Sequence, residues 1–203
     1  MFFVVPPSFF QKPVNVTTRL GSVATFYCFA EGSPQPTILW QKGNIILSAG
    51  ETSGRMRVLE DTTLEIFDVQ KMDKGTYTCI VENKMNRQQM MSDATLHVLY
   101  APTIASTSNN ETAYENNRII LRCKVDGFPA PSVTWFTDDD VRSNIDFAVS
   151  KNGNEHLLTI TNVKDVHEGQ YICEAKNKLG VARKELFLNV GSKYKTLYYE
   201  IFF

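Results

Sequence analysis

Two cysteines, one tryptophan and one tyrosine recur in the same order in each half of the chain, and this repeat constrains the fold most. The first copy consists of Cys28, Trp40, Tyr77 and Cys79. The second copy consists of Cys123, Trp135, Tyr171 and Cys173. Corresponding residues lie 94 or 95 positions apart, and such a fixed period indicates tandem copies of one structural unit. We therefore predict two domains, residues 1–100 and 101–191, followed by a tail, 192–203, whose role the repeat does not explain.

The segments around these residues have the patterns of β-strands. Residues 23–28 alternate between two sets of side chains, as in a strand with one buried face. The pattern Leu-x-Ile-x-x-Val begins at Leu64 and again at Leu158. Segments rich in proline and glycine, at 32–36 and 127–131, interrupt the strands and predict turns. The sequence therefore predicts an all-β fold in both halves.

The repeated residues carry a resemblance to a known family. A tryptophan packed on a disulfide between two sheets, with a tyrosine two residues before the second cysteine, is the core signature of immunoglobulin domains. The chain resembles the immunoglobulin superfamily in both halves, and the G-x-P-x-P-x-x-x-W pattern beginning at Gly32 and Gly127 resembles its I-set branch. The resemblance implies two tandem I-set Greek-key β-sandwiches, whose cores contain Trp40, Tyr77, Trp135 and Tyr171.

The four cysteines fit two disulfides within the domains. Sequence alone allows three connectivities, and the repeat favours Cys28–Cys79 and Cys123–Cys173. Each bridge closes a loop for which the chain-entropy estimate is ~4 kcal/mol of stabilisation. Such bonds persist mainly outside the cytosol, so we predict an extracellular or cell-surface protein. Cytosolic muscle I-set domains also hold cysteines at these positions, unbridged, so an intracellular protein stays open as an alternative.

Charge and hydropathy limit the partners. The net charge is −1, from 21 basic and 22 acidic residues, so no basic excess favours nucleic acid. The sequence contains no apolar run of the roughly 18 residues that predict a membrane span. Residues 1–5 are apolar but lack the basic start and the cleavage site of a complete signal peptide. We expect the chain to be a piece of a longer protein.

No motif in the sequence predicts catalysis, a cofactor or a metal site. The three histidines, none of which has the spacing of a metal-ligand set, are His97, His156 and His167. The acidic run Asp138–Asp140 is typical of a solvated turn, because a calcium site needs several converging oxygens. His167 stands where the first copy has Asp73, so a charge pair made by Asp73 is not expected to recur in the second domain.

Two N-glycosylation sequons are present, Asn15-Val16-Thr17 and Asn110-Glu111-Thr112. The asparagine, serine and threonine content makes about two such triplets expected by chance. The sequons are compatible with secretion but add little to the argument from the paired cysteines. Asn15 and Asn110 are therefore glycosylation candidates only.

Outward-facing apolar residues are the remaining candidates for function, because a contiguous apolar patch on a sheet often marks a protein interface. With Trp40 and Cys79 facing the core, alternation places Leu39 and Ile80 on the outside of their sheet. The same alternation, which also places Thr95 outside, gives the interface candidates Leu39, Ile80, Met91, His97, Phe136, Ile172 and Phe187. On the other sheet of the second domain, three outward basic residues leave a heparin-type glycan open as a weaker alternative: Arg118, Arg122 and Lys124.

The tandem arrangement and the turn motifs resemble the ectodomains of cell-adhesion and axon-guidance receptors. Asp126-Gly127-Phe128-Pro129 is similar to domains of the neural cell adhesion molecule and fasciclin group, and the first domain is similar to Roundabout-like and receptor-phosphatase I-set domains. The resemblance implies non-enzymatic recognition of a protein partner, either a like molecule or another surface or secreted protein. Two alternatives stay open: an intracellular sarcomeric or cytoskeletal scaffold pair, and a secreted protein that sequesters a ligand.

Overall fold

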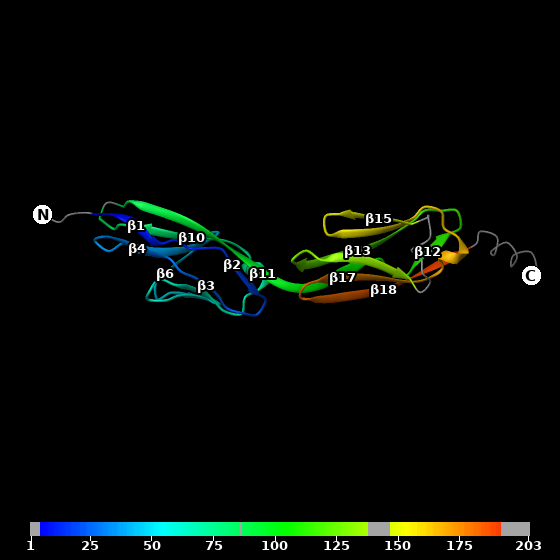
Figure 1. Cartoon of the computed structure of the whole chain (residues 1–203), viewed down its shortest axis with the longest axis horizontal. Coiled ribbons are helices and arrows are strands. Elements are labelled where there is room, and N and C mark those ends of the chain that lie inside the picture. Colours follow the sequence, from blue (N-terminus) through cyan, green and yellow to red (C-terminus); the bar gives the residue numbers. More distant parts are fainter. Residues whose placement is uncertain (1–4, 86, 138–146, 192–203) are drawn as a thin grey trace, which may run out of the picture. The chain divides into compact units, whose positions relative to one another are not determined.

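The computed structural model describes residues 5–85, 87–137 and 147–191. They form two compact units, which we call the first and second domains, and the chain passes from one to the other between Leu99 and Tyr100. Each domain is a sandwich of two β-layers (Figure 1), so the predicted all-β sandwich architecture is confirmed. The acidic run Asp138–Asp140 and the tail 192–203 lie outside the described residues.

One sheet of the first domain is built around β10 (Gly75–Glu82). This strand pairs antiparallel with β5 (Thr37–Lys42) and with the first part of β11 (Gln89–Thr107). At one edge β6 (Ile45–Ser48) pairs with β5, and at the other edge β2 (Val16–Arg19) pairs in parallel with β11. The order across this sheet is therefore β2-β11-β10-β5-β6.

The facing layer of the first domain is made of shorter strands. They pair in two groups, β1 with β4 and β3-β9-β8-β7. Their bounds are β1 Val5–Gln11, β3 Ala24–Phe26, β4 Phe29–Ser33, β7 Thr52–Ser53, β8 Met56–Val58 and β9 Leu64–Ile66. A short 3-10 turn, η1 (Lys71–Asp73), leads into β10.

The second domain repeats this arrangement. One sheet has the order β12-β18-β17-β14, with β12 parallel to β18, and the other is formed by β15, β16, β13 and the last part of β11. The 3-10 turn η3 (Asp165–His167) precedes β17. The strand bounds are β12 Glu111–Tyr114, β13 Ile119–Phe128, β14 Ser132–Thr137, β15 Phe147–Asn152, β16 Glu155–Ile160, β17 Gly169–Asn177 and β18 Gly180–Gly191.

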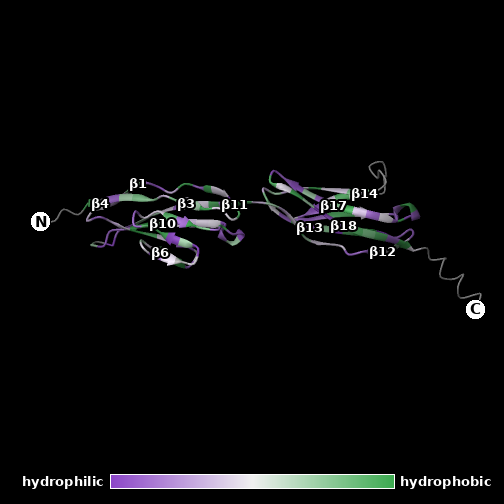
Figure 2. Cartoon of the chain, turned by 90° about the horizontal axis from the view of Figure 1, so that it is seen from below, coloured by the Kyte–Doolittle hydropathy of each residue, from purple (hydrophilic) through white to green (hydrophobic). Residues whose placement is uncertain are grey.

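Alternating burial along the strands explains why the layers pack face to face. In β13, Leu121, Cys123 and Val125 are buried, whereas Arg122 and Lys124 between them are exposed. Successive side chains of a strand point to opposite faces, so one face of each sheet is apolar and fills the core. Figure 2 shows this change between hydrophobic and hydrophilic residues along the strands of both domains.

A disulfide joins the two layers of each domain. Cys28 is bonded to Cys79, and Cys123 is bonded to Cys173, with a Cα–Cα distance of 6.5 Å in both bridges. The predicted pairing is therefore confirmed.

Aromatic side chains complete the two cores differently. Trp40 is 1% exposed, and its indole N–H donates to the carbonyl oxygen of Thr62 at 2.7 Å. The ring of Phe26 lies 5.9 Å from that of Trp40 and 5.0 Å from that of Tyr77. Trp135 is only half-buried and packs at the side of the second core. The first domain thus has the more fully enclosed tryptophan.

The tyrosine before the second cysteine closes a corner in each domain. The Tyr77 hydroxyl donates to the backbone oxygen of Asp73 at 2.8 Å, and the Tyr171 hydroxyl donates to that of His167 at 2.9 Å. Burial raises the pKa of Tyr171 to about 12 and raises that of Tyr77 further. Both tyrosines therefore act as buried hydrogen-bond donors over the physiological pH range.

Candidate recognition surface

Strand β10 brings apolar side chains from neighbouring strands into one row. Ile80 lies directly opposite Leu39 on β5 and Met91 on β11. Directly paired residues of an antiparallel sheet point to the same face. Cys79 and Trp40 form the adjacent pair and are buried in the core, so the row of Leu39, Ile80 and Met91 faces outward.

The members of this row are unequally exposed. Met91 is 59% exposed and Leu39 is half-buried, but Ile80 is only 5% exposed. The expectation that Ile80 presents free surface is therefore wrong, although its side chain is on the outer face. Ile80 is in the central strand, between the strands that carry Leu39 and Met91, where neighbours on both sides leave little free area. A partner would meet Met91 and Leu39 first.

Ile46 adds an exposed apolar side chain that the sequence argument missed. It lies on β6 opposite Gln41, which is opposite Thr78 of β10, so this second row is next to the first on the same face. Ile46 is 54% exposed, and its neighbour Leu47 is buried, so alternation could have identified it. The second row also carries polar groups, and the Thr78 hydroxyl donates to Asp93 at 2.6 Å. We define the candidate surface as Leu39, Ile46, Ile80 and Met91.

His97, the remaining candidate of the first domain, lies apart from this surface. It is six residues from Met91 on β11, which corresponds to about 20 Å along a strand. His97 pairs with Thr17 of β2 and is half-buried, as is Thr95. The structure therefore does not bring His97 together with the apolar rows.

The second domain has a smaller apolar group on the corresponding sheet. Ile172 on β17 lies opposite Phe136 on β14 and Glu185 on β18. Phe136 and Ile172 are half-buried, and Phe187, which is 39% exposed, pairs with Gln170 in the next row. A carboxylate therefore borders this group, as Asp93 does opposite Thr78 at the equivalent position of the first domain.

The basic strip considered for a sulfated glycan contains an acid. Arg118, Arg122 and Lys124 are all exposed. Glu155 of β16 lies opposite Lys124, and its carboxylate is 3.4 Å from the Arg122 guanidinium. The carboxylate lowers the positive charge that a sulfated glycan would meet.

The charged group of the first corner is buried and paired. The Asp73 side chain is 2% exposed. Its carboxylate accepts two hydrogen bonds from the Arg55 guanidinium, of which the one from Nη2 is 2.9 Å long. It also accepts one from the Gln70 backbone N–H at 2.7 Å. Burial opposes ionisation, but these donors and the ammonium of Lys42 at 3.8 Å outweigh it and lower the pKa of Asp73. Burial lowers the pKa of Lys42 despite the nearby carboxylate. This network holds the corner and contacts none of the candidate surface residues.

His167 replaces Asp73 in the second domain and caps the turn as a neutral acceptor. Its Nδ1 accepts a hydrogen bond from the backbone N–H of Lys164 at 3.0 Å, as the Asp73 carboxylate does from Gln70. The imidazole packs edge-on against the ring of Phe147, with 5.3 Å between centroids. The backbone geometry of the corner is thus preserved by a different side chain.

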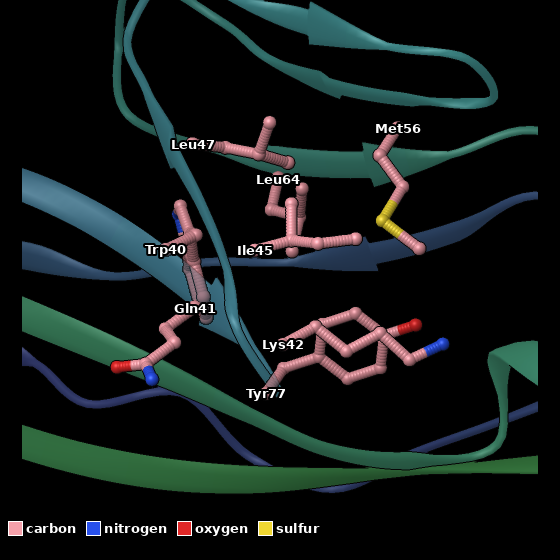
Figure 3. Close-up of a pocket in the computed structure, with 8 residues that line it drawn as sticks. All are labelled: Trp40, Gln41, Lys42, Ile45, Leu47, Met56, Leu64 and Tyr77. Carbon is pink, nitrogen blue, oxygen red and sulfur yellow. The ribbon is translucent and has the colours of Figure 1, made fainter.

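The hollow beside the first corner is part of the core and not a ligand site. Figure 3 shows its lining, including Trp40, Met56 and the side chain of Lys42 alongside the ring of Tyr77. The Lys42 ammonium is 5.1 Å from the centroid of that ring. The hollow has about 190 Å³ of empty space, part of it open solvent, and admits no water-sized sphere.

Among residues 5–85, 87–137 and 147–191, no three histidine, cysteine, aspartate or glutamate side chains converge as a metal site. The same residues form no helix with the length and hydropathy needed to cross a membrane.

Comparison with known proteins identifies the family. The family model of the immunoglobulin I-set domain matches residues 7–98 and 102–190. The chain belongs to the immunoglobulin I-set family. Each match falls within one domain of this I-set chain, so the predicted I-set sandwiches are confirmed.

Curated relatives of this I-set chain include named membrane and adhesion proteins. The limbic system-associated membrane protein of Gallus gallus is 31% identical over 185 residues, covering 91% of this chain and 52% of that protein. Neural cell adhesion molecule 1 of Homo sapiens is 31% identical over 207 residues, covering 92% and 24%. The chain thus spans about half the length of the first of these relatives. The resemblance to cell-adhesion receptor ectodomains is confirmed.

Solved structures share the tandem fold. The structure of Dpr2 Ig1-Ig2 in complex with DIP-Theta Ig1-Ig3 has a TM-score of 0.75 and 26% identity, covering 94% of this chain and 66% of that one. The titin tandem A164-A165 has a TM-score of 0.68 and 22% identity, covering 94% and 100%. At this identity the titin likeness shows the fold alone.

Proposed function

We propose that this chain is a non-enzymatic recognition module of the cell surface, which binds a protein partner through the candidate surface of its first domain. The observation that carries the proposal is the exposure of Met91 and Ile46 beside the apolar side chains of Leu39 and Ile80. Apolar groups contributed by four adjacent strands offer a continuous contact area, which is typical of protein interfaces. The neural cell adhesion molecule among the relatives supports the same class of function.

The composition of this face suits a partner that binds and dissociates. Gln41, Thr78 and Asp93 border the apolar row and remain able to contact water. An apolar centre with a polar rim is the usual anatomy of an interface between proteins that are also stable apart. The partner is therefore either a second copy of the chain or another surface or secreted protein.

The test uses Met91→Glu combined with Ile46→Glu, because both side chains are more than half exposed and the fold does not depend on them. Phe10→Glu is the matched control, since Phe10 is 78% exposed on β1 of the other layer. Sedimentation of the pure chain across concentrations measures self-association, and binding of the tetramerised chain to a panel of ectodomains from the same organism measures other partners. The double variant should lose binding at least tenfold while the control keeps it. Unchanged binding by the double variant, or no binding in either assay, would contradict the proposal.

The cellular compartment of the protein is tested separately, by whether its four cysteines are disulfide-bonded in the native source. Protein isolated from its native source should contain no free thiols, because Cys28–Cys79 and Cys123–Cys173 are bonded. A count of four thiols under denaturing, non-reducing conditions would instead favour the intracellular scaffold.

A further inference from the structure

The two sequons occupy the same structural position in the two domains. Asn15 immediately precedes β2, and Asn110 immediately precedes β12. Both of these strands pair in parallel with the last strand of their domain, Val16 opposite Leu96 and Glu111 opposite Leu188. Chance can supply two sequons, but it gives no reason for both to fall at one register position of the repeat.

The side-chain oxygen of each asparagine has a structural role there. Asn15 Oδ1 accepts a hydrogen bond from the backbone N–H of Thr95 at 2.8 Å, and Asn110 Oδ1 accepts one from Phe187 at 3.0 Å. Thr95 and Phe187 precede Leu96 and Leu188, so each carboxamide oxygen extends the parallel ladder by one bond beyond its strand. A buried or edge N–H is satisfied in this way without a backbone carbonyl.

The geometry leaves the nitrogen atom, Nδ2, of each asparagine carboxamide turned to solvent. Both asparagines are exposed, and so are Thr17 and Thr112, whose hydroxyls complete the sequons. The hydrogen bonds to Thr95 and Phe187 use Oδ1, whereas glycosylation uses Nδ2. Attachment of a sugar is therefore compatible with the hydrogen bond to the last strand.

We propose that Asn15 and Asn110 each carry an N-linked glycan. After attachment, the carboxamide oxygen of each asparagine stays hydrogen-bonded to the backbone N–H of Thr95 or Phe187, respectively. In the transfer, Nδ2 forms a bond to C1 of a lipid-linked oligosaccharide and gives up one proton. The C1–O bond to the pyrophosphate breaks, and the lipid pyrophosphate leaves. The step requires the secretory pathway, as the proposed cell-surface function does, but it does not depend on the candidate surface.

The position of the glycans has a consequence for each sheet. β2 and β12 are edge strands, and an uncovered edge is a template for pairing with another chain. A glycan at the start of the edge strand obstructs such pairing. In the first domain β2 and β6 are opposite edges of the sheet, so the glycan leaves the side that carries Ile46 open to a partner.

The experiment expresses the full chain with a cleavable secretion leader in cultured animal cells. The secreted protein is treated with a peptide amidase that removes N-glycans in ¹⁸O water, and the tryptic peptides ending at Arg19 and Arg118 are analysed by mass spectrometry. We expect ¹⁸O-labelled aspartate at positions 15 and 110. Unmodified asparagine at either position overturns the proposal for that domain, whether or not the chain binds a partner.

Matched variants separate the glycan from the hydrogen bond. Thr17→Ala and Thr112→Ala should each remove one glycan and keep the asparagine, whereas Thr17→Ser and Thr112→Ser should keep the glycan. Amide exchange at Thr95 and Phe187 should be equally slow with and without the glycan, and about tenfold faster in Asn15→Ala and Asn110→Ala, respectively. Faster exchange in the glycosylated chain would overturn the claim that the hydrogen bond persists, and wild-type peptide mapping decides occupancy even if a variant is not secreted.

Discussion

The two domains have nearly the same core but different outer faces at the same level of the sheet. One residue beyond the second cysteine, the first domain has the apolar row Leu39, Ile80 and Met91. The corresponding row of the second domain is Thr134, Glu174 and Arg183, in which the guanidinium and carboxylate are 2.6 Å apart. Core positions repeat because both domains must pack a disulfide and a tryptophan between two layers, whereas outer positions are not bound by that requirement. The outer faces of the two domains are therefore free to differ in what they bind.

The buried polar groups differ as well. The first domain buries a charge, Asp73, and satisfies it with Arg55. The second domain buries His156 opposite Cys123, and its Nε2 has no hydrogen-bond partner among residues 5–85, 87–137 and 147–191. One domain is therefore stabilised by a buried charge, and the other depends on a buried imidazole staying neutral.

The largest expected effect is on the unfolding free energy, when asparagine replaces either Asp73 or His167 at the tyrosine corner of its domain. Asp73→Asn removes the charge that Arg55 and Lys42 surround, so the first domain should lose about 2 kcal/mol of unfolding free energy. His167→Asn keeps a neutral acceptor for the Lys164 N–H, so the second domain should lose about 1 kcal/mol or less, mainly from the lost contact with Phe147. Denaturant unfolding of each variant, followed by domain-specific signals, measures both losses. Equal losses would show that the charge at Asp73 adds nothing.

Acidification should destabilise the two domains to different extents, and the expected effect is intermediate in size. Burial, and then Lys151, lower the pKa of His156 below 6.5, so its neutral ring stabilises the second domain above pH 6.5 and this stability is lost as the pH falls below that value. Asp73 has a pKa below 3.8, so its contribution is present above pH 3.8 and is lost only below it.

Thermal unfolding between pH 7 and pH 4 should therefore show the second domain losing stability through His156, while Asp73 still supports the first. His156→Gln should flatten the pH dependence of the second domain's stability. Asp73→Asn should leave the pH dependence of the first domain's stability unchanged over the same range. A second-domain profile that His156→Gln does not alter would refute the role given to the imidazole.

The smallest expected effect concerns the polar row of the second domain. The Arg183 side chain is 69% exposed, so its pair with Glu174 is screened by water. Arg183→Ala should change the unfolding free energy by less than about 1 kcal/mol, as measured in urea. A larger loss would mean that this row is structural, and the contrast with the apolar row of the first domain would then carry less functional meaning.

Ile80 and Met91 show that the sequence predicts the direction of a side chain in a strand but not its exposure. Alternation from Trp40 and Cys79 predicts the outward direction of both side chains, because direction in a strand is a local property of period two. Exposure depends on what neighbouring strands place alongside, and this register is not visible in one strand's sequence. Ile80 is therefore outward but covered, and Ile46 joins the surface only through the pairing of β6 with β5.

By itself the sequence determined the two-domain repeat, the all-β class and the favoured pairing of the four cysteines, because repeated spacing and alternation depend on local geometry. Its resemblance to the immunoglobulin superfamily implied the sandwich and the tyrosine corners. Only the tertiary structure decided which outward residues are exposed, which charges surround Asp73, and what the sequon asparagines contact. Asn15 and Asn110 looked like chance triplets in the chain. Folding places each beside a strand about 80 residues away in sequence and gives its oxygen a donor there, which no short-range pattern can report.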